Sequence, residues 1–171
     1  PRVAGRGLEW GVLAAITVVA AGLRLWKLDQ NGYGKLYYAA AVRSMLASWG
    51  NFFFGSLDPG GFVTVDKPPV ALWIQGFSAK FFGYEGVNLL WPQAVMGVAT
   101  VVLIYAVVRK PFGAVAALLA AGVLAVTPIG VAVDRDNLPD SALVLVLVLA
   151  AWCLGRAAVD GRLGPLLAST A

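Results

Sequence analysis

The chain has 171 residues, 60% of them hydrophobic, and a formal net charge of +4. This apolar share is well above the roughly 45–50% of soluble domains, so the composition argues against a soluble protein and predicts an integral membrane protein. Histidine is absent and Cys153 is the one cysteine. These counts exclude imidazole bases, histidine-ligated zinc and a disulfide framework.

Four apolar segments are long enough to cross a bilayer as helices, which takes about 17–25 residues. In chain order they cover about residues 8–26, 89–108, 112–133 and 141–159. The first ends in Arg24, Trp26 and Lys27, a basic and aromatic group typical of a membrane interface, and has no cleavage pattern. Residues 165–171 read as the start of another span, so we expect residues 1–171 to form one transmembrane module, the N-terminal part of a larger protein.

The charged residues between these segments segregate by sign. Basic residues in short loops mark the cytoplasmic side, which predicts a multi-pass protein of the cell membrane with a cytoplasmic N-terminus. We therefore interpret the positive charge as an orientation signal rather than a nucleic-acid surface. The predicted cytoplasmic residues are Arg2, Arg6, Arg109, Lys110, Arg156 and Arg162, and the predicted outer acids are Asp29, Asp58, Asp66, Glu85, Asp134, Asp136 and Asp140.

Residues 27–88 form a segment too long to be a simple turn. Helical spacing of apolar residues predicts two helices in it, at about 35–48 and 69–82. The sequence NFFFGSLDPGG, residues 51–61, is expected to be irregular. The second helix has only 12 uncharged residues between Lys67 and Lys80, too few to span, so we expect it to lie along the outer membrane surface.

Asp29 follows the first span directly, in the sequence LWKLDQNGYG. Gly32 and Gly34 permit close approach of the backbone, and Tyr33 adds an amphipathic ring. Two interpretations stay open. Asp29 can be a solvated loop residue, or it can take the proton from an attacking hydroxyl.

Asp66 and Lys67 precede two prolines, which fix the backbone. An ammonium held there suits a lipid phosphate, although Lys67 can also be an interfacial lysine at a helix start.

The sequence DRDNLPD, residues 134–140, allows several roles. Asp134 and Asp136 can hold a divalent cation, Asp136 or Asp140 can cap the next helix, and Arg135 can pair with these acids or with a phosphate.

Together these motifs resemble the GT-C glycosyltransferases of family 39, which include protein O-mannosyltransferases and aminoarabinose transferases. The resemblance rests on an Asp after the first span with a Tyr four residues on, on Asp-Lys-Pro-Pro, on Leu-x-x-Pro-Gln, and on an Arg before the Leu-x-Asp that opens the fourth span. Three segments of this chain are most similar to an actinobacterial branch of the family: NGYGKLYYAAAVRSML, FFFGSLDPGGFVTVDKPPVALW and DRDNLPD. The chain departs from the family at Gln30, where a second acid is common.

The resemblance implies an all-α bundle with about four transmembrane helices and two interfacial helices in a long first outer loop. It implies an enzyme that moves a sugar, with inversion, from a polyprenyl-phosphate donor to a hydroxyl of a glycan, lipid or protein outside the cytoplasm. No cofactor is expected and a divalent cation is not favoured. The implied roles are catalysis for Asp29, phosphate binding for Asp66 and Lys67 with Arg135 or Arg43, and substrate binding for Tyr33 and Asp140.

Two other classes of protein fit parts of the sequence. A non-enzymatic lipid-binding protein, flippase or scaffold would use Lys67 as a headgroup anchor and would not need an acid at position 29. A metal-dependent transferase would instead use Asp134 and Asp136.

Overall fold

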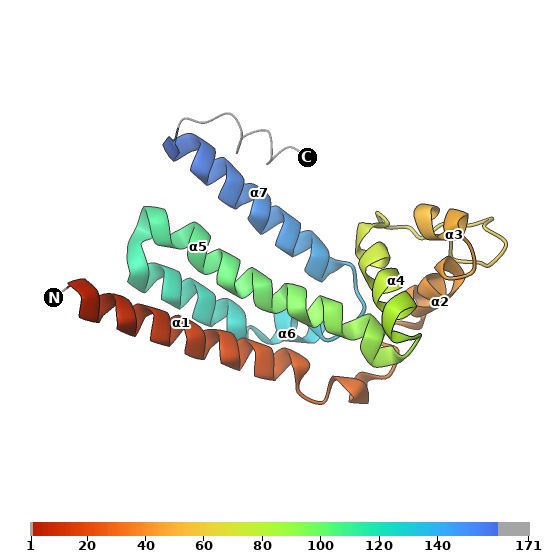
Figure 1. Ribbon diagram of the computed structural model, residues 1–171, viewed down its shortest axis with the longest axis horizontal. Helices are drawn as coiled ribbons and strands as arrows, with labels where there is room; N and C mark the ends of the chain where they lie inside the picture. The colour runs from red at the N-terminus through yellow and green to blue at the C-terminus, as the bar shows by residue number, and fades with distance from the viewer. Residues whose placement is uncertain (1, 161–171) are drawn as a thin grey trace.

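A computed structural model describes residues 2–160, and its regular elements are helices (Figure 1). Within that range the only β-type pairing is an isolated bridge between Ser56 and Thr64. Three helices are long and apolar enough to cross a membrane, over Arg6–Leu25, Gly86–Val126 and Asp140–Ala157. The all-α membrane fold predicted from the sequence is confirmed. The expected start of a further span, residues 165–171, lies outside the described residues.

The long helices form a bundle of α1 (Arg2–Leu25), α5 (Gly86–Val126) and α7 (Asp140–Asp160). Figure 1 shows that the first part of α5 runs toward the end of the bundle where the N-terminus lies, and that the second part runs back beside the first. The turn lies at Gly113, whose φ of 86° and ψ of 177° are open to glycine but not to other residues. α5 therefore contains two antiparallel runs, which explains why two spans were predicted within it.

The predicted span at 112–133 is not one helix. α5 ends at Val126, Thr127 is extended with φ −63° and ψ 115°, and α6 (Pro128–Asp134) begins at the next residue. A proline disfavours the helical conformation of the residue before it, but fits the first turn of a new helix. The Thr127-Pro128 step therefore divides this segment.

Four short helices gather at the end of the bundle opposite the N-terminus (Figure 1). They are η1 (Leu28–Asn31), α2 (Leu36–Met45), α3 (Trp49–Phe54) and α4 (Val70–Phe82). Together with residues 134–140 we call this region the loop end. α4 has 13 residues, too few to cross a bilayer.

The expectation of irregular structure from residue 51 was wrong for the first four residues, because α3 covers them. Ser48 caps this helix by accepting a hydrogen bond from the Asn51 N–H at 3.1 Å. Gly55 ends it in the left-handed conformation, with φ 63°. A serine cap and a glycine stop separated by six residues were the signal that sequence analysis missed.

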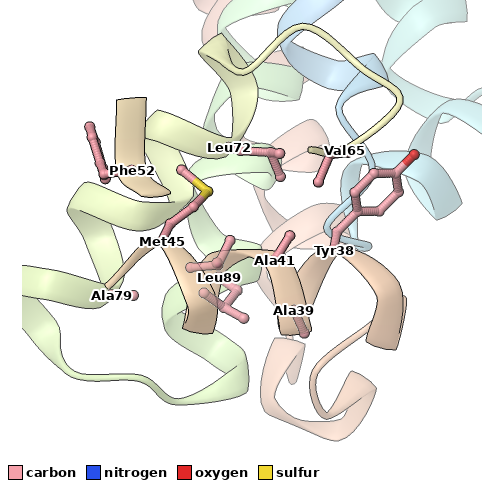
Figure 2. Close-up of a cluster of buried hydrophobic side chains, with 10 residues drawn as sticks. Tyr38, Ala39, Ala41, Met45, Phe52, Val65, Leu72, Ala79 and Leu89 are labelled. Carbon is pink, nitrogen blue, oxygen red and sulfur yellow. The ribbon is translucent and has the colours of Figure 1, made fainter. Parts of the chain in front are cut away.

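A hydrophobic core holds the loop end together (Figure 2). It joins residues from α2, α3, α4 and the start of α5, and each large apolar side chain buried in this way contributes about 1.5–3 kcal/mol. The segment between the first two long helices is therefore a packed unit and not a loose loop. The buried members are Tyr38, Ala39, Ala41, Val42, Met45, Phe52, Val65, Leu72, Ala79 and Leu89.

Candidate functional site

Asp29 lies on η1, a single short turn directly beyond α1. The turn lies between Lys27, with a positive φ of 49°, and Gly32, with φ 57°. The Asp29 side chain is exposed. On its far side the turn is tied down by Asn31, whose Nδ2 donates to the Arg135 carbonyl at 2.8 Å. The structure therefore presents this carboxylate to solvent from a fixed backbone.

The Arg135 guanidinium binds backbone carbonyls of the chain itself. Nη1 donates to three carbonyls at the end of α1 and Nη2 to a fourth at 3.4 Å, an arrangement that suits a cation at a helix C-terminus. The Nη1 acceptors are Leu23 at 3.0 Å, Arg24 at 3.2 Å and Trp26 at 2.8 Å, and the Nη2 acceptor is Lys27. Most of the hydrogen-bonding capacity that sequence analysis assigned to a phosphate is occupied here.

Asp66 and Lys67 lie just before α4, and both side chains are exposed. The Lys67 Nζ is 3.9 Å from Asp66 Oδ2, and about half of the Lys67 side chain is open to solvent, 49%. The Tyr37 hydroxyl donates to Asp66 Oδ1 at 3.4 Å. Asp66 is thus oriented from both sides, and the ammonium keeps room for a ligand.

Tyr38 is a buried residue whose hydroxyl is influenced by the charge of two acids that sequence analysis selected. Its ring lies in the core of the loop end, with the hydroxyl at the edge of that cluster (Figure 2). Burial raises the pKa of this hydroxyl, and the nearby carboxylates of Asp66 and Asp140 raise it further. Both carboxylates therefore act on this hydroxyl through their charge. Nothing in the sequence distinguished Tyr38 from the neighbouring helix residues.

Tyr33 and Arg43 are brought together by Tyr84. The two tyrosine rings stack with centroids 5.4 Å apart, and the Arg43 guanidinium lies 5.3 Å from the centroid of Tyr84. The Tyr84 hydroxyl donates to the Ala39 carbonyl at 2.7 Å. Burial, and then the neighbouring Tyr33, raise the pKa of Tyr84, although Arg43 acts in the opposite direction. This stack forms an amphipathic wall beside the Asp29 turn.

Asp134 and Asp136 bind different partners. The oxygens of Asp134 accept from Arg24 Nε at 2.8 Å and from the Ser141 hydroxyl at 2.7 Å. Asp136 Oδ1 accepts the N–H groups of Lys35 at 2.9 Å and Asn137 at 2.8 Å. In the part of the chain that the structure describes, no group of three or more acids or cysteines is placed to hold a metal ion.

The side chain of Arg24 faces the interior of the bundle, which was not expected from the sequence. Its side chain is 1% exposed and forms a buried ion pair with Asp134. A basic residue in the last turn of one apolar span and an acid at the matching depth of another were the available signal. An unpaired charge is costly in a bundle interior, so two opposite charges at one depth favour a pair.

Asp140 begins α7 and lines a cavity of about 250 Å³ beside this ion pair. The wall is mostly apolar and carries a few polar groups, a combination common in ligand sites. The polar lining residues are Arg24, Thr100, Asp134, Asp140 and Ser141.

Comparison with known proteins gives a consistent result. Residues 66–171 match the family described as dolichyl-phosphate-mannose-protein mannosyltransferase. Two Bacillus subtilis proteins named "Putative mannosyltransferase", YycA and YkcB, are 48% and 45% identical over 93% and 92% of the chain. The polyprenol-phosphate-mannose–protein mannosyltransferase of Corynebacterium glutamicum is 27% identical over 86% of the chain. No solved structure matches.

The chain spans only 23%, 22% and 29% of the length of these three relatives. The match to the family covers more than half of the chain, and the Bacillus relatives cover nearly all of it. The resemblance predicted from the motifs is confirmed: the chain belongs to the dolichyl-phosphate-mannose-protein mannosyltransferase family.

Proposed function

We propose that the chain is part of a membrane glycosyltransferase that moves a sugar from a polyprenyl-phosphate donor to an acceptor hydroxyl outside the cytoplasm. The printed name of the Corynebacterium relative gives mannose as its sugar and protein as its acceptor, so these are the first substrates to test. One observation carries the proposal. An exposed carboxylate on a fixed turn and an exposed ammonium beside two prolines lie at the same end of an apolar bundle.

In this proposal Asp29 acts as the general base. It accepts the proton of the acceptor hydroxyl while that oxygen forms a bond to the anomeric carbon. The bond between the anomeric carbon and the phosphate oxygen breaks, and its electron pair leaves with the polyprenyl phosphate. A phosphate leaves without a general acid, so one carboxylate suffices, and a single displacement inverts the anomeric carbon.

Lys67 supplies positive charge to the departing phosphate. Charge aimed at the point where negative charge develops stabilises the transition state, especially where water is sparse. Asp66 and Tyr37 orient the lysine, and Arg43 is a further cation of the loop end. The Tyr33 ring offers a face on which a sugar can stack. The Asp140 carboxylate can accept hydrogen bonds from the hydroxyls of that sugar.

Asp29→Asn in the full-length protein tests the assignment, because it keeps the size of the side chain and removes its basicity. Turnover should fall by roughly 10²–10⁴-fold, the usual contribution of a general base. Glu85→Gln is the matched control, since Glu85 is an exposed acid of the same region and makes no capping bond with its side chain. Near-normal turnover in Asp29→Asn would remove Asp29 as the base and direct attention to Asp66 or Asp140.

A further inference from the structure

Two arginines, Arg24 and Arg135, each donate to carbonyls at the C-terminal end of another helix. Arg24, in the last turn of α1, donates from Nη1 to the Ala125 carbonyl at 2.9 Å and from Nη2 to the Leu124 carbonyl at 3.3 Å, both at the end of α5. Arg135, directly after α6, donates to carbonyls at the end of α1. Each cation therefore satisfies carbonyls that the helix end leaves without intrahelical partners.

The Arg24–Asp134 ion pair fixes this arrangement from inside the bundle. Arg24 Nε lies 2.8 Å from Asp134 Oδ2, and the Arg24 side chain is almost completely buried. The Ser141 hydroxyl holds the other oxygen of Asp134. Breaking a buried pair leaves an uncompensated charge. The pair thus joins α1, α5, α6 and α7 at the level of the loop end.

Gly97 of α5 leaves the space in which the pair lies. A Cβ at this position would lie 2.2 Å from Asp134 Oδ2 and 2.9 Å from Arg24 Nε. Real Cβ atoms do not approach other atoms so closely, so even an alanine would displace the pair.

The Asp29 turn is held on both sides by one residue. Before Asp29, the carbonyls of Trp26 and Lys27 accept from the Arg135 guanidinium. After Asp29, the Asn31 amide donates to the Arg135 carbonyl. The position of Asp29 therefore depends on Arg135, which directly follows Asp134.

We propose that Arg135, anchored by the Arg24–Asp134 pair, is a positioning residue that fixes where the Asp29 carboxylate stands relative to the acceptor. The inference rests on the proposed function. A general base must come within about 2.6–3.2 Å of the group it deprotonates. A displacement of about 1 Å can cost about 10²-fold in rate. Positioning thus predicts a lower kcat at an unchanged KM for the donor, whereas phosphate binding by Arg135 predicts a higher KM for the donor.

The first test is Gly97→Ala in the full-length enzyme, which moves the pair without removing a charge. We expect kcat to fall by about 10- to 100-fold, with the KM for the lipid donor nearly unchanged. The control is Gly122→Ala in the same element, where a Cβ would meet only Ile16 Cδ1, at an ordinary 3.9 Å. Gly97→Ala with the kcat of the parent enzyme would overturn the inference.

Arg135→Lys separates positioning from phosphate binding. Lysine keeps the charge but cannot reproduce a planar fork that binds four carbonyls. A fall in kcat at constant donor KM supports positioning. A rise in donor KM, whether or not kcat also falls, would assign Arg135 to the phosphate and overturn the inference.

A double-mutant cycle with Asp29→Asn decides whether the effect passes through Asp29. If it does, Gly97→Ala should have little further effect once the base is gone, because effects of residues that act as a unit are not additive. The same loss in both backgrounds would show a general structural role and overturn the inference. Full turnover of Asp29→Asn alone would instead count against the proposed function, so the two failures are distinguishable.

Discussion

The side chain of Asn137 pairs with both backbone groups of Lys35, which is 102 positions away: Oδ1 accepts the Lys35 N–H at 2.9 Å and Nδ2 donates to the Lys35 carbonyl at 3.1 Å. Nδ2 also donates to the Tyr33 carbonyl at 3.1 Å. The Asn137 backbone carbonyl accepts from Gln75 Nε2 at 2.9 Å. One fully buried residue therefore ties the segment after α6 to the start of α2 and to α4.

Replacing Asn137 by alanine should destabilise the loop end. The carbonyls of Tyr33 and Lys35 lose a donor in a partly buried place, and an unsatisfied buried group costs about 1–3 kcal/mol. Asn88→Ala is the control, because Asn88 also donates to two carbonyls, at 2.9 Å and 3.0 Å, but in an exposed position. Thermal unfolding of the purified protein in detergent should show a clearly larger loss for Asn137→Ala, and equal losses would contradict this account.

Asp58 should make the segment between α3 and α4 sensitive to acid. Hydrogen bonds from the N–H groups of Val63 at 2.8 Å and Phe62 at 3.2 Å hold the pKa of Asp58 below its usual value. Because the folded pKa is depressed, the stabilisation is present above the unfolded pKa, about 3.9, and is lost as the pH falls through the folded value.

Amide hydrogen exchange measures this effect directly. Protection of Val63 should fall at acid pH, whereas protection of Val65, which donates to the Gly55 carbonyl at 3.0 Å, should respond less. In Asp58→Asn the Val63 amide should already be less protected at neutral pH. Protection of Val63 that does not change with pH in the parent protein would refute the role of the carboxylate.

The segregation of charges predicts that the loop end faces outward and that the turn around Lys110 faces the cytoplasm. Single cysteines at positions 59 and 110 in a Cys153→Ser background can be labelled in intact cells with a membrane-impermeant thiol reagent. Position 59 should react at once and position 110 only after permeabilisation. The reverse pattern would invert the topology and move the proposed site to the cytoplasmic face.

Features with a local physical cause could be predicted from the sequence. Apolar runs of sufficient length marked the long helices, and helical spacing marked α2 and α4, because one face of each packs on a core. The wrongly predicted helix boundaries also had local causes. The Thr127-Pro128 step and the Ser48 cap are short signals, and longer apolar patterns obscured them.

The contacts around the site could not be predicted, because they join residues about a hundred positions apart. Arg24 and Asp134 are 110 positions apart in the sequence, and the one signal for their pairing is the matching depth of two opposite charges in different spans. Arg135 and Lys67 show the same limit. Both were selected as phosphate-binding cations, but only the fold shows that the Arg135 guanidinium binds carbonyls while the Lys67 ammonium remains exposed.

Lys67→Ala in the full-length protein should weaken donor binding and so separate the two enzyme mechanisms considered above. Loss of a charge-assisted contact to phosphate costs about 1.5–3 kcal/mol, or roughly 10- to 150-fold in affinity. Lys67→Arg should restore binding only in part, because a planar fork does not replace a compact ammonium. The measurement is binding of a polyprenyl phosphate to the purified protein, with Lys80→Ala as the control for a general loss of surface charge.

If side chains neutralise the phosphate, EDTA should change neither binding nor turnover. Loss of turnover in EDTA that Mg²⁺ or Mn²⁺ restores would favour the metal-dependent mechanism, and unchanged binding in Lys67→Ala would remove this lysine from the donor site.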